Sequence, residues 1–215
     1  MTVSQAITSR RSMRAFKPDP ISRETLLQIL RDASYSPSWA NSQPWEVFVA
    51  EGEALKRIKA GYADCYAKAV RANTDIPRPA EWTEAAKKRQ QGLHPDMVRD
   101  CGDAVQQFGA LNQRMFDAPA VIFLCKDKIL SIPWALYDIG AFSQTLMLSA
   151  LEHGLGTIPA ATSIHYPEVL RRELKLPENL EIVIGIAIGY VDETNAINNF
   201  RSARSPIEET VRFCD

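Results

Sequence analysis

The sequence predicts an α+β fold in which a mixed β-sheet of about four strands is flanked by helices around one long central helix. The longest run of helical periodicity spans residues 131–153, and its apolar side chains occur on every face, as expected for a helix buried on all sides. Residues 183–189 are the only stretch with the continuous apolar character of a parallel strand. With 215 residues, 46% of them apolar, the chain is long enough to bury a core, and we predict a single domain over residues 1–215.

Local signals predict the other elements in chain order. Ser22 is a good N-cap for the helix that follows it, and Pro167 suits the first turn of another helix. Apolar residues three to four apart predict the helices, and alternating or continuous apolar residues predict the strands. The predicted helices span 2–8, 22–33, 53–71, 101–116 and 167–175, and the predicted strands span 45–50, 119–125 and 182–190.

Residues 73–100 differ in composition from the rest of the chain. They begin with Pro77, Pro79 and Trp82 and continue as a run rich in lysine, arginine and glutamine, with little apolar surface for a core. Insertions of this length are often functional. We expect a variable helical excursion that acts as a lid, while a disordered insertion and a pair of surface helices remain open alternatives.

The charges nearly balance but are unevenly distributed. The 25 lysines and arginines against 26 aspartates and glutamates give a net charge of −1, which argues against a nucleic-acid-binding protein. Residues 1–18 nevertheless contain three arginines and a lysine without a single acid, and Arg201, Arg204 and Arg212 follow near the other end. The two basic ends are therefore either solvated surface or a binding site.

Neither a metal site nor a membrane segment is predicted. The four cysteines lie far apart without a C-x-x-C motif, and none of the three histidines is near a cysteine in sequence. The longest apolar run, residues 182–191, is about half the length that a bilayer requires. Residues 1–10 lack the apolar core of a secretion signal. These features, together with free thiols, lead us to expect a cytoplasmic protein.

Two segments are candidates for binding an anion. The first is Arg10-Arg11-Ser12-Met13-Arg14, where guanidinium groups can donate bidentate hydrogen bonds to phosphate oxygens at any physiological pH. The second holds Arg201 and Arg204 shortly before a proline. A solvated basic turn and an exposed tail are the plain alternatives for these two segments.

Two other segments suit a flat polar ligand. Residues 36–45, S-P-S-W-A-N-S-Q-P-W, present amide, hydroxyl and indole groups between two conformationally restricting prolines, although such residues are also common in ordinary turns. Residues 154–162 combine small side chains with Pro159, which allows a ligand to approach the backbone closely. A tight connection between a helix and a strand is the alternative there. No dinucleotide-binding or P-loop glycine motif is present.

Each segment is weak by itself, but their combination and order resemble the FMN-dependent nitroreductase family. The resemblance covers about residues 5–213, and S-P-S-W-A-N-S-Q-P-W is its most specific part. Residues 77–119, with Trp82, Asn112 and Arg114, look most like the nitrobenzene reductase-like branch. The resemblance implies a nitroreductase-like fold, an intertwined homodimer with shared active sites and FMN at the interface. It also implies NAD(P)H-driven, ping-pong reduction of nitroaromatic or quinone acceptors.

The resemblance also assigns cofactor-binding residues by position. They comprise the phosphate and ribityl segment Arg10, Arg11, Ser12 and Arg14, the tail residues Arg201 and Arg204, Arg114, the loop residues Pro37, Ser38, Trp39 and Asn41 facing the flavin of the other subunit, and the backbone segment Pro159, Ala160 and Ala161 beside the ring. Trp39 and Asn41 are also expected to bind the acceptor. No catalytic side chain is expected, because the flavin carries the electron chemistry. The arginines of the two ends are thus predicted to meet at one phosphate.

Other functions remain open from the residues alone. One alternative is another activity of the same superfamily, namely dehalogenation, dehydrogenation or the fragmentation of flavin. A second alternative is a non-catalytic flavin-storage dimer, which needs only the arginine and loop segments. Trp39 stands where many family members have a small residue, so it is expected to narrow the acceptor pocket or to stack on a flat substrate. The run after Pro159 lacks the Glu-Gly pair found in many relatives.

Overall fold

The computed structural model describes residues 1–214 and has the α+β architecture that the sequence predicts. Helices and strands are interspersed along the chain, and short 3₁₀ turns connect several of them. The helices are α1 (Val3–Ser9), α2 (Arg23–Ser34), α3 (Gly52–Ala67), α4 (Glu84–Cys101), α5 (Phe108–Gln113), α6 (Ile132–Glu152) and α7 (Pro167–Leu174). The strands are β1 (Glu46–Glu51), β2 (Ala120–Asp127), β3 (Gly156–Ala160) and β4 (Leu180–Gly189).

The four strands form one sheet in the order β1-β2-β4-β3. Each neighbouring pair is antiparallel, so the prediction of a mixed sheet is wrong. The continuous apolar character of β4 arises because this strand lies inside the sheet and is covered on both faces, as a parallel strand would be. A parallel pairing does occur outside the strands, as an isolated bridge between Ser12 and Thr157.

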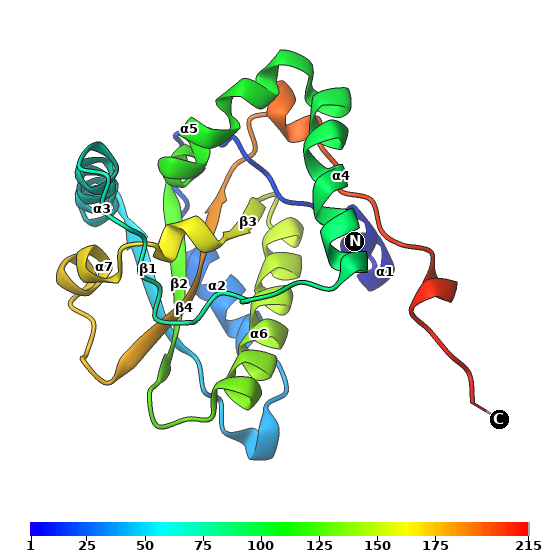
Figure 1. Ribbon diagram of the computed structural model, residues 1–215. Helices are drawn as coiled ribbons and strands as arrows, with labels where there is room; N and C mark the ends of the chain where they lie inside the picture. Colours follow the sequence, from blue (N-terminus) through cyan, green and yellow to red (C-terminus); the bar gives the residue numbers. More distant parts are fainter. Residues whose placement is uncertain (215) are drawn as a thin grey trace.

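Two apolar clusters, one on each face of the sheet, hold the helices in place. On β2, Ile122 and Leu124 point to a cluster shared with α2 and α6, whereas Val121 and Phe123 point to a cluster shared with α3 and α7. Figure 1 shows the resulting layers, with α6 along one face of the sheet and α3 and α7 on the other. The alternation follows directly from the two-residue period of a strand.

The long helix occurs where the sequence predicts it, but its environment differs. Ile139, Phe142 and Leu146 form its buried face. Trp134 and Tyr137 are 52% and 74% exposed, so the prediction of a helix buried on all sides is wrong for the single chain. The apolar outer face of α6 remains available to another surface.

The excursion at 73–100 is ordered and attached to the core. Asp75 accepts hydrogen bonds from Arg171 Nη2 at 2.6 Å and from the Ile182 N–H at 2.8 Å. The excursion continues as α4, whose last turns bury Met97 and Cys101 against the larger cluster. These contacts contradict the disordered-insertion alternative. Within residues 73–100 only Met97 is buried, in agreement with the small core contribution that the composition predicts, and a lid function stays a prediction.

Two further expectations need correction. The predicted helix at 101–116 is broken, because Gly102 has a φ of 55° and Met115–Asp117 adopt left-handed backbone conformations. Residues 156–160, interpreted as a connection, form the edge strand β3. All four cysteines are free, as expected. No helix within residues 1–214 has both the length and the hydropathy to cross a membrane.

Candidate active site

The two basic ends of the chain meet in a hollow that we call the arginine basin. Its volume is about 450 Å³. Residues from α1, the segment after it and the C-terminal tail line the basin, namely Ile7, Thr8, Arg10, Arg11, Ser12, Arg201, Ser202 and Arg204. The structure therefore brings together arginines that are almost 200 residues apart in sequence, as predicted.

Buried hydrogen bonds from Asn198 hold the two ends together. Asn198 Oδ1 accepts from the Arg14 N–H at 2.6 Å and from the Ala15 N–H at 3.2 Å, and its Nδ2 donates to the Ala15 carbonyl at 2.9 Å. The side chain is only 3% exposed, so these bonds are shielded from water. Sequence reasoning missed Asn198, because nothing local distinguishes it from an ordinary turn residue.

The basin concentrates positive charge without a neutralising acid among its lining residues. Burial lowers the pKa of Arg10, and the neighbouring charges of Arg204 and Arg201 lower it further. Arg201 Nη2 donates to the Thr8 carbonyl, and Arg204 Nη1 donates to Ser202 Oγ at 2.8 Å. Three guanidinium groups held close to one another repel, and a bound anion would relieve that repulsion.

Arg14 lies beside the basin in a half-buried aromatic setting. Its guanidinium carbon is 4.9 Å from the ring centroid of Phe200 and 5.8 Å from that of Phe108. Nη1 donates to the Ser12 carbonyl at 2.9 Å, whereas the buried Nε has no hydrogen-bond partner in the described chain. Burial lowers the pKa of Arg14. The buried Nε is thus a donor without a partner within residues 1–214, although Arg14 is not among the residues that line the basin.

The edge strand β3 connects the basin to the predicted ring-binding segment. The Met13 N–H donates to the Thr157 carbonyl at 3.0 Å, which places the arginine segment alongside β3. A strand rises about 3.3 Å per residue, so Ala160 lies roughly 10 Å further along the strand. Pro159 and Ala161 are exposed there.

Close packing beneath the ring-binding segment fixes its backbone. Ser163 Oγ donates to the Ala160 carbonyl at 2.5 Å. A Cβ atom on Gly185 would lie 2.2 Å from that same Oγ, so only glycine fits under the turn. The segment is thereby presented as a rigid surface rather than as a flexible loop.

The loop at residues 36–44 has a strained backbone that α6 holds in place. Ala40, Asn41 and Gln43 have φ values of 51°, 56° and 46°, which are uncommon for residues with side chains. The backbone N–H of Trp39 donates to Asp138 Oδ2 on α6 at 3.1 Å. Each such residue costs on the order of 1–3 kcal/mol, and strain of this kind clusters at functional sites.

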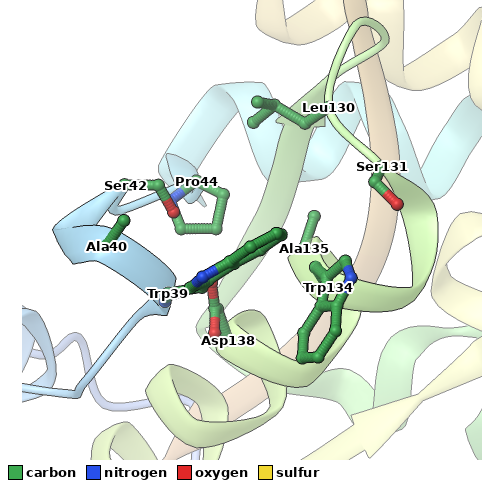
Figure 2. A pocket seen from close by; sticks show the side chains of 9 residues that line it. All are labelled: Trp39, Ala40, Ser42, Pro44, Leu130, Ser131, Trp134, Ala135 and Asp138. Atoms are coloured by element: carbon green, nitrogen blue, oxygen red, sulfur yellow. Dashed lines mark hydrogen bonds between the residues drawn. The ribbon is translucent and has the colours of Figure 1, made fainter.

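The same loop and α6 enclose a second hollow, which we call the indole pocket (Figure 2). Its volume is about 250 Å³. The indole rings of Trp39 and Trp134 lie side by side, with centroids 4.8 Å apart and planes inclined by 45°. The pocket is lined by Trp39, Ala40, Ser42, Pro44, Leu130, Ser131, Trp134, Ala135 and Asp138. Sequence reasoning missed Trp134 and Asp138, whose only signal was an aromatic and an acid within an otherwise apolar helix.

Eight of the predicted binding residues line neither hollow, namely Arg14, Pro37, Ser38, Asn41, Arg114, Pro159, Ala160 and Ala161. Arg114, Pro37 and Asn41 are three of these eight. Arg114 is exposed and forms an ion pair with Asp117, with Nη2 2.8 Å from Oδ2. Pro37 and Asn41 belong to the loop, but their exposed side chains do not line the indole pocket. No contact within residues 1–214 therefore directs these three residues toward the arginine basin.

Comparison with known proteins identifies the family. Residues 7–190 match the model of the Nitroreductase family. The chain belongs to this family. Among curated nitroreductases, the chain is 32% identical over 214 residues to nitroreductase NfnB of Mycolicibacterium smegmatis, an alignment that covers 96% of this chain and 90% of that protein. It is 31% identical over 221 residues to chloronitrobenzene nitroreductase of Comamonas testosteroni, covering 98% and 96% of the two chains.

Solved nitroreductase structures share the whole fold. FMN-dependent nitroreductase NfnB from Mycobacterium smegmatis, solved in complex with NADPH, superposes with a TM-score of 0.89 at 30% identity and covers 99% of this chain and 97% of its own. FMN- and NADPH-dependent nitroreductase NfnB from Sphigopyxis sp. strain HMH superposes with a TM-score of 0.91 at 27% identity over all of both chains. The similarity to these two structures thus extends over nearly all of this chain.

Proposed function

We propose that the protein is an FMN-dependent nitroreductase that uses NAD(P)H to reduce nitroaromatic or quinone acceptors by two electrons. The observation that carries this proposal is the arginine basin, where Arg10, Arg201 and Arg204 converge and no described residue of the lining is acidic. The segment that follows Arg11 pairs with the edge strand β3. Relatives named for nitroaromatic reduction at about one-third identity support the same function.

The residues present fit FMN. The basin would hold the terminal phosphate through Arg10, Arg11, Ser12, Arg201 and Arg204. Arg14, two residues after Ser12, would contact the ribityl chain. The roughly 10 Å along β3 would let that chain extend from the basin to Pro159–Ala161, of which Pro159 and Ala161 are exposed. FMN, when bound, supplies the hydride transfer, and the protein binds and orients the reactants.

The loop residues act across a homodimer in this proposal. Trp39 and Asn41 are exposed in the single chain, as are Pro37 and the outer face of α6. Beyond Arg204 the tail runs away from the rest of the chain (Figure 1) and exposes Ile207 and Phe213 by 66% and 92%. An extended segment with exposed apolar side chains suits packing on a second copy. Sedimentation of the intact protein, compared with a chain ending at Pro206, tests this dimer.

Nicotinamide and acceptor are proposed to use one pocket in turn. In this proposal the flavin ring lies against Pro159–Ala161 on one side and faces the loop around Trp39 on the other. Only one face of the ring would then be open to both reactants. Initial rates with both substrates varied should then give parallel double-reciprocal lines. Intersecting lines would require both reactants to be bound at once and would contradict the shared pocket.

A visible spectrum of the purified protein is the direct test of function. We expect a yellow protein whose absorbance NADPH or NADH bleaches without air, and whose colour returns when a nitroaromatic acceptor is added. Bleaching without reoxidation by any acceptor would favour another flavin activity, and a protein that binds FMN but is not bleached would be a flavin store. Protein that takes up no FMN would contradict the proposal.

A further inference from the structure

We propose that the indole pocket binds neutral, single-ring nitroaromatic acceptors and that Asp138 discriminates against anionic ones. This inference rests on the proposed nitroreductase function and names the substrate class of that site. It is carried by the size of the pocket, by the chemistry of its walls and by one buried carboxylate in its lining.

The size of the pocket limits the acceptor. Its volume is about 250 Å³. An apolar cavity of about 150 Å³ is enough for benzene, so one ring with a nitro group and a small substituent fits here. Pro44 and Leu130 also line the pocket, and in the view of Figure 2 both lie above the indole rings.

The walls favour an electron-poor aromatic ring. The indoles of Trp39 and Trp134 are electron-rich and inclined to each other by 45°, so together they form an angled aromatic wall. A nitro group withdraws electrons from its ring, which strengthens offset stacking on such faces. Serine hydroxyls at Ser42 and Ser131 supply polar contacts at the rim.

The only charged residue in the lining is Asp138, which is 2% exposed. Figure 2 shows its carboxyl group beneath the Trp39 indole. No lysine, arginine or histidine lines the pocket to pair with a substrate carboxylate. Poor solvation at a buried carboxylate strengthens its repulsion of a second negative charge. An acceptor with a carboxylate is therefore disfavoured, while a neutral acceptor of the same shape is not.

Asp138 also positions the loop, and the test must separate that role from its charge. Its Oδ2 accepts the Trp39 N–H at 3.1 Å, and an asparagine keeps an oxygen acceptor there without the charge. The Asp138→Asn variant is thus expected to retain the loop conformation while it loses the repulsion.

The experiment compares 4-nitrobenzamide with 4-nitrobenzoate, which have nearly the same shape and differ in charge. In the holoenzyme we expect kcat/KM to favour the amide roughly tenfold or more, the size of one like-charge contact in a poorly solvated site. In Asp138→Asn, the rate with the benzoate should rise and the preference should fall to within about twofold. Equal rates in the parent, or an unchanged preference in the variant, would overturn the inference.

Two further variants test the pocket itself. Trp134→Ala should raise KM for the amide several-fold, because it removes one aromatic wall. Ile129→Ala is the matched control, since Ile129 is 88% exposed next to Leu130 and does not line the pocket. Equal effects of the two variants would place the acceptor elsewhere.

A binding measurement separates failure of this inference from failure of the proposed nitroreductase function. If neither compound is reduced, quenching of indole fluorescence by the same two compounds still measures their binding. Stronger binding of the amide, lost in Trp134→Ala, would support the charge selection without the reaction. Quenching that does not distinguish the two compounds would contradict it.

Discussion

The arginine basin is assembled from the two ends of the chain, whereas the indole pocket is assembled from one loop and the first turns of α6. The basin is polar, carries several positive charges and is held together by Asn198. The pocket is mainly apolar and contains a single buried carboxylate. The first arrangement suits recognition by charge and the second suits recognition by shape and stacking, so perturbing the two should separate cofactor retention from acceptor binding.

Arg204→Ala should have the largest effect, and it should act on the cofactor. Loss of a charge-assisted hydrogen bond to phosphate is expected to weaken FMN binding about ten- to a hundredfold. Turnover at saturating FMN should change much less. Flavin retained after dialysis measures the effect, and Arg212→Ala, an exposed tail arginine outside the basin, is the control. Equal FMN content in Arg204→Ala and the parent would contradict the basin as the phosphate site.

Salt should separate the two regions without any substitution. Screening shortens the reach of exposed charges, so raising NaCl from about 0.05 M to about 0.5 M should weaken FMN binding roughly tenfold. KM for a neutral acceptor, measured with FMN saturating, should stay within about twofold, because stacking is not screened. An acceptor KM that follows the FMN affinity would show that the two regions are not independent.

Trp39→Ala tests the shape-selective region from its loop side. Loss of the aromatic wall should raise KM for aromatic acceptors about three- to tenfold, while FMN content should fall much less than in Arg204→Ala. Trp39→Phe keeps an aromatic face and should retain most of the affinity. Unchanged KM values for every aromatic acceptor would show that Trp39 does not line the acceptor site.

Phe200→Leu should have the smallest effect and would refine the description of the basin. The Phe200 ring lies 4.9 Å from the Arg14 guanidinium carbon, and leucine keeps the apolar volume without the aromatic face. We expect FMN binding to weaken about two- to fivefold through the lost cation–π contact. A larger loss, accompanied by a lower melting temperature, would indicate that Phe200 supports the fold rather than Arg14.

Much of the fold was predictable because its signals are local. Ser22 caps α2 and Pro167 begins α7 as expected, and the apolar runs that become β2 and β4 are evident in the sequence. The antiparallel pairing was not predictable from β4, because burial on both faces gives the same apolar run in either direction. β3 was missed because a short segment of small residues with a proline resembles a turn.

The candidate site was predictable in part for the same reason. Arg10, Trp39 and the tail arginines stand in segments whose composition is unusual on its own. Trp134 and Asp138 were missed because both lie within a helix that the sequence marks only as apolar, and the helical period alone does not show which loop faces them. Roles for Arg114, Pro37 and Asn41 at the cofactor remain predictions.

The sequence by itself determined most of the secondary elements, the acid-free N-terminal segment and the family resemblance, since each depends on neighbouring residues or their order. Only the tertiary structure decided that the arginines converge, that Ser12 forms a bridge with Thr157 of β3 and that Asp138 accepts a hydrogen bond from the backbone of Trp39. These outcomes join residues about 100 to almost 200 positions apart. They depend on the order in which strands pair and on hydrogen bonds buried between distant segments, which local patterns do not specify.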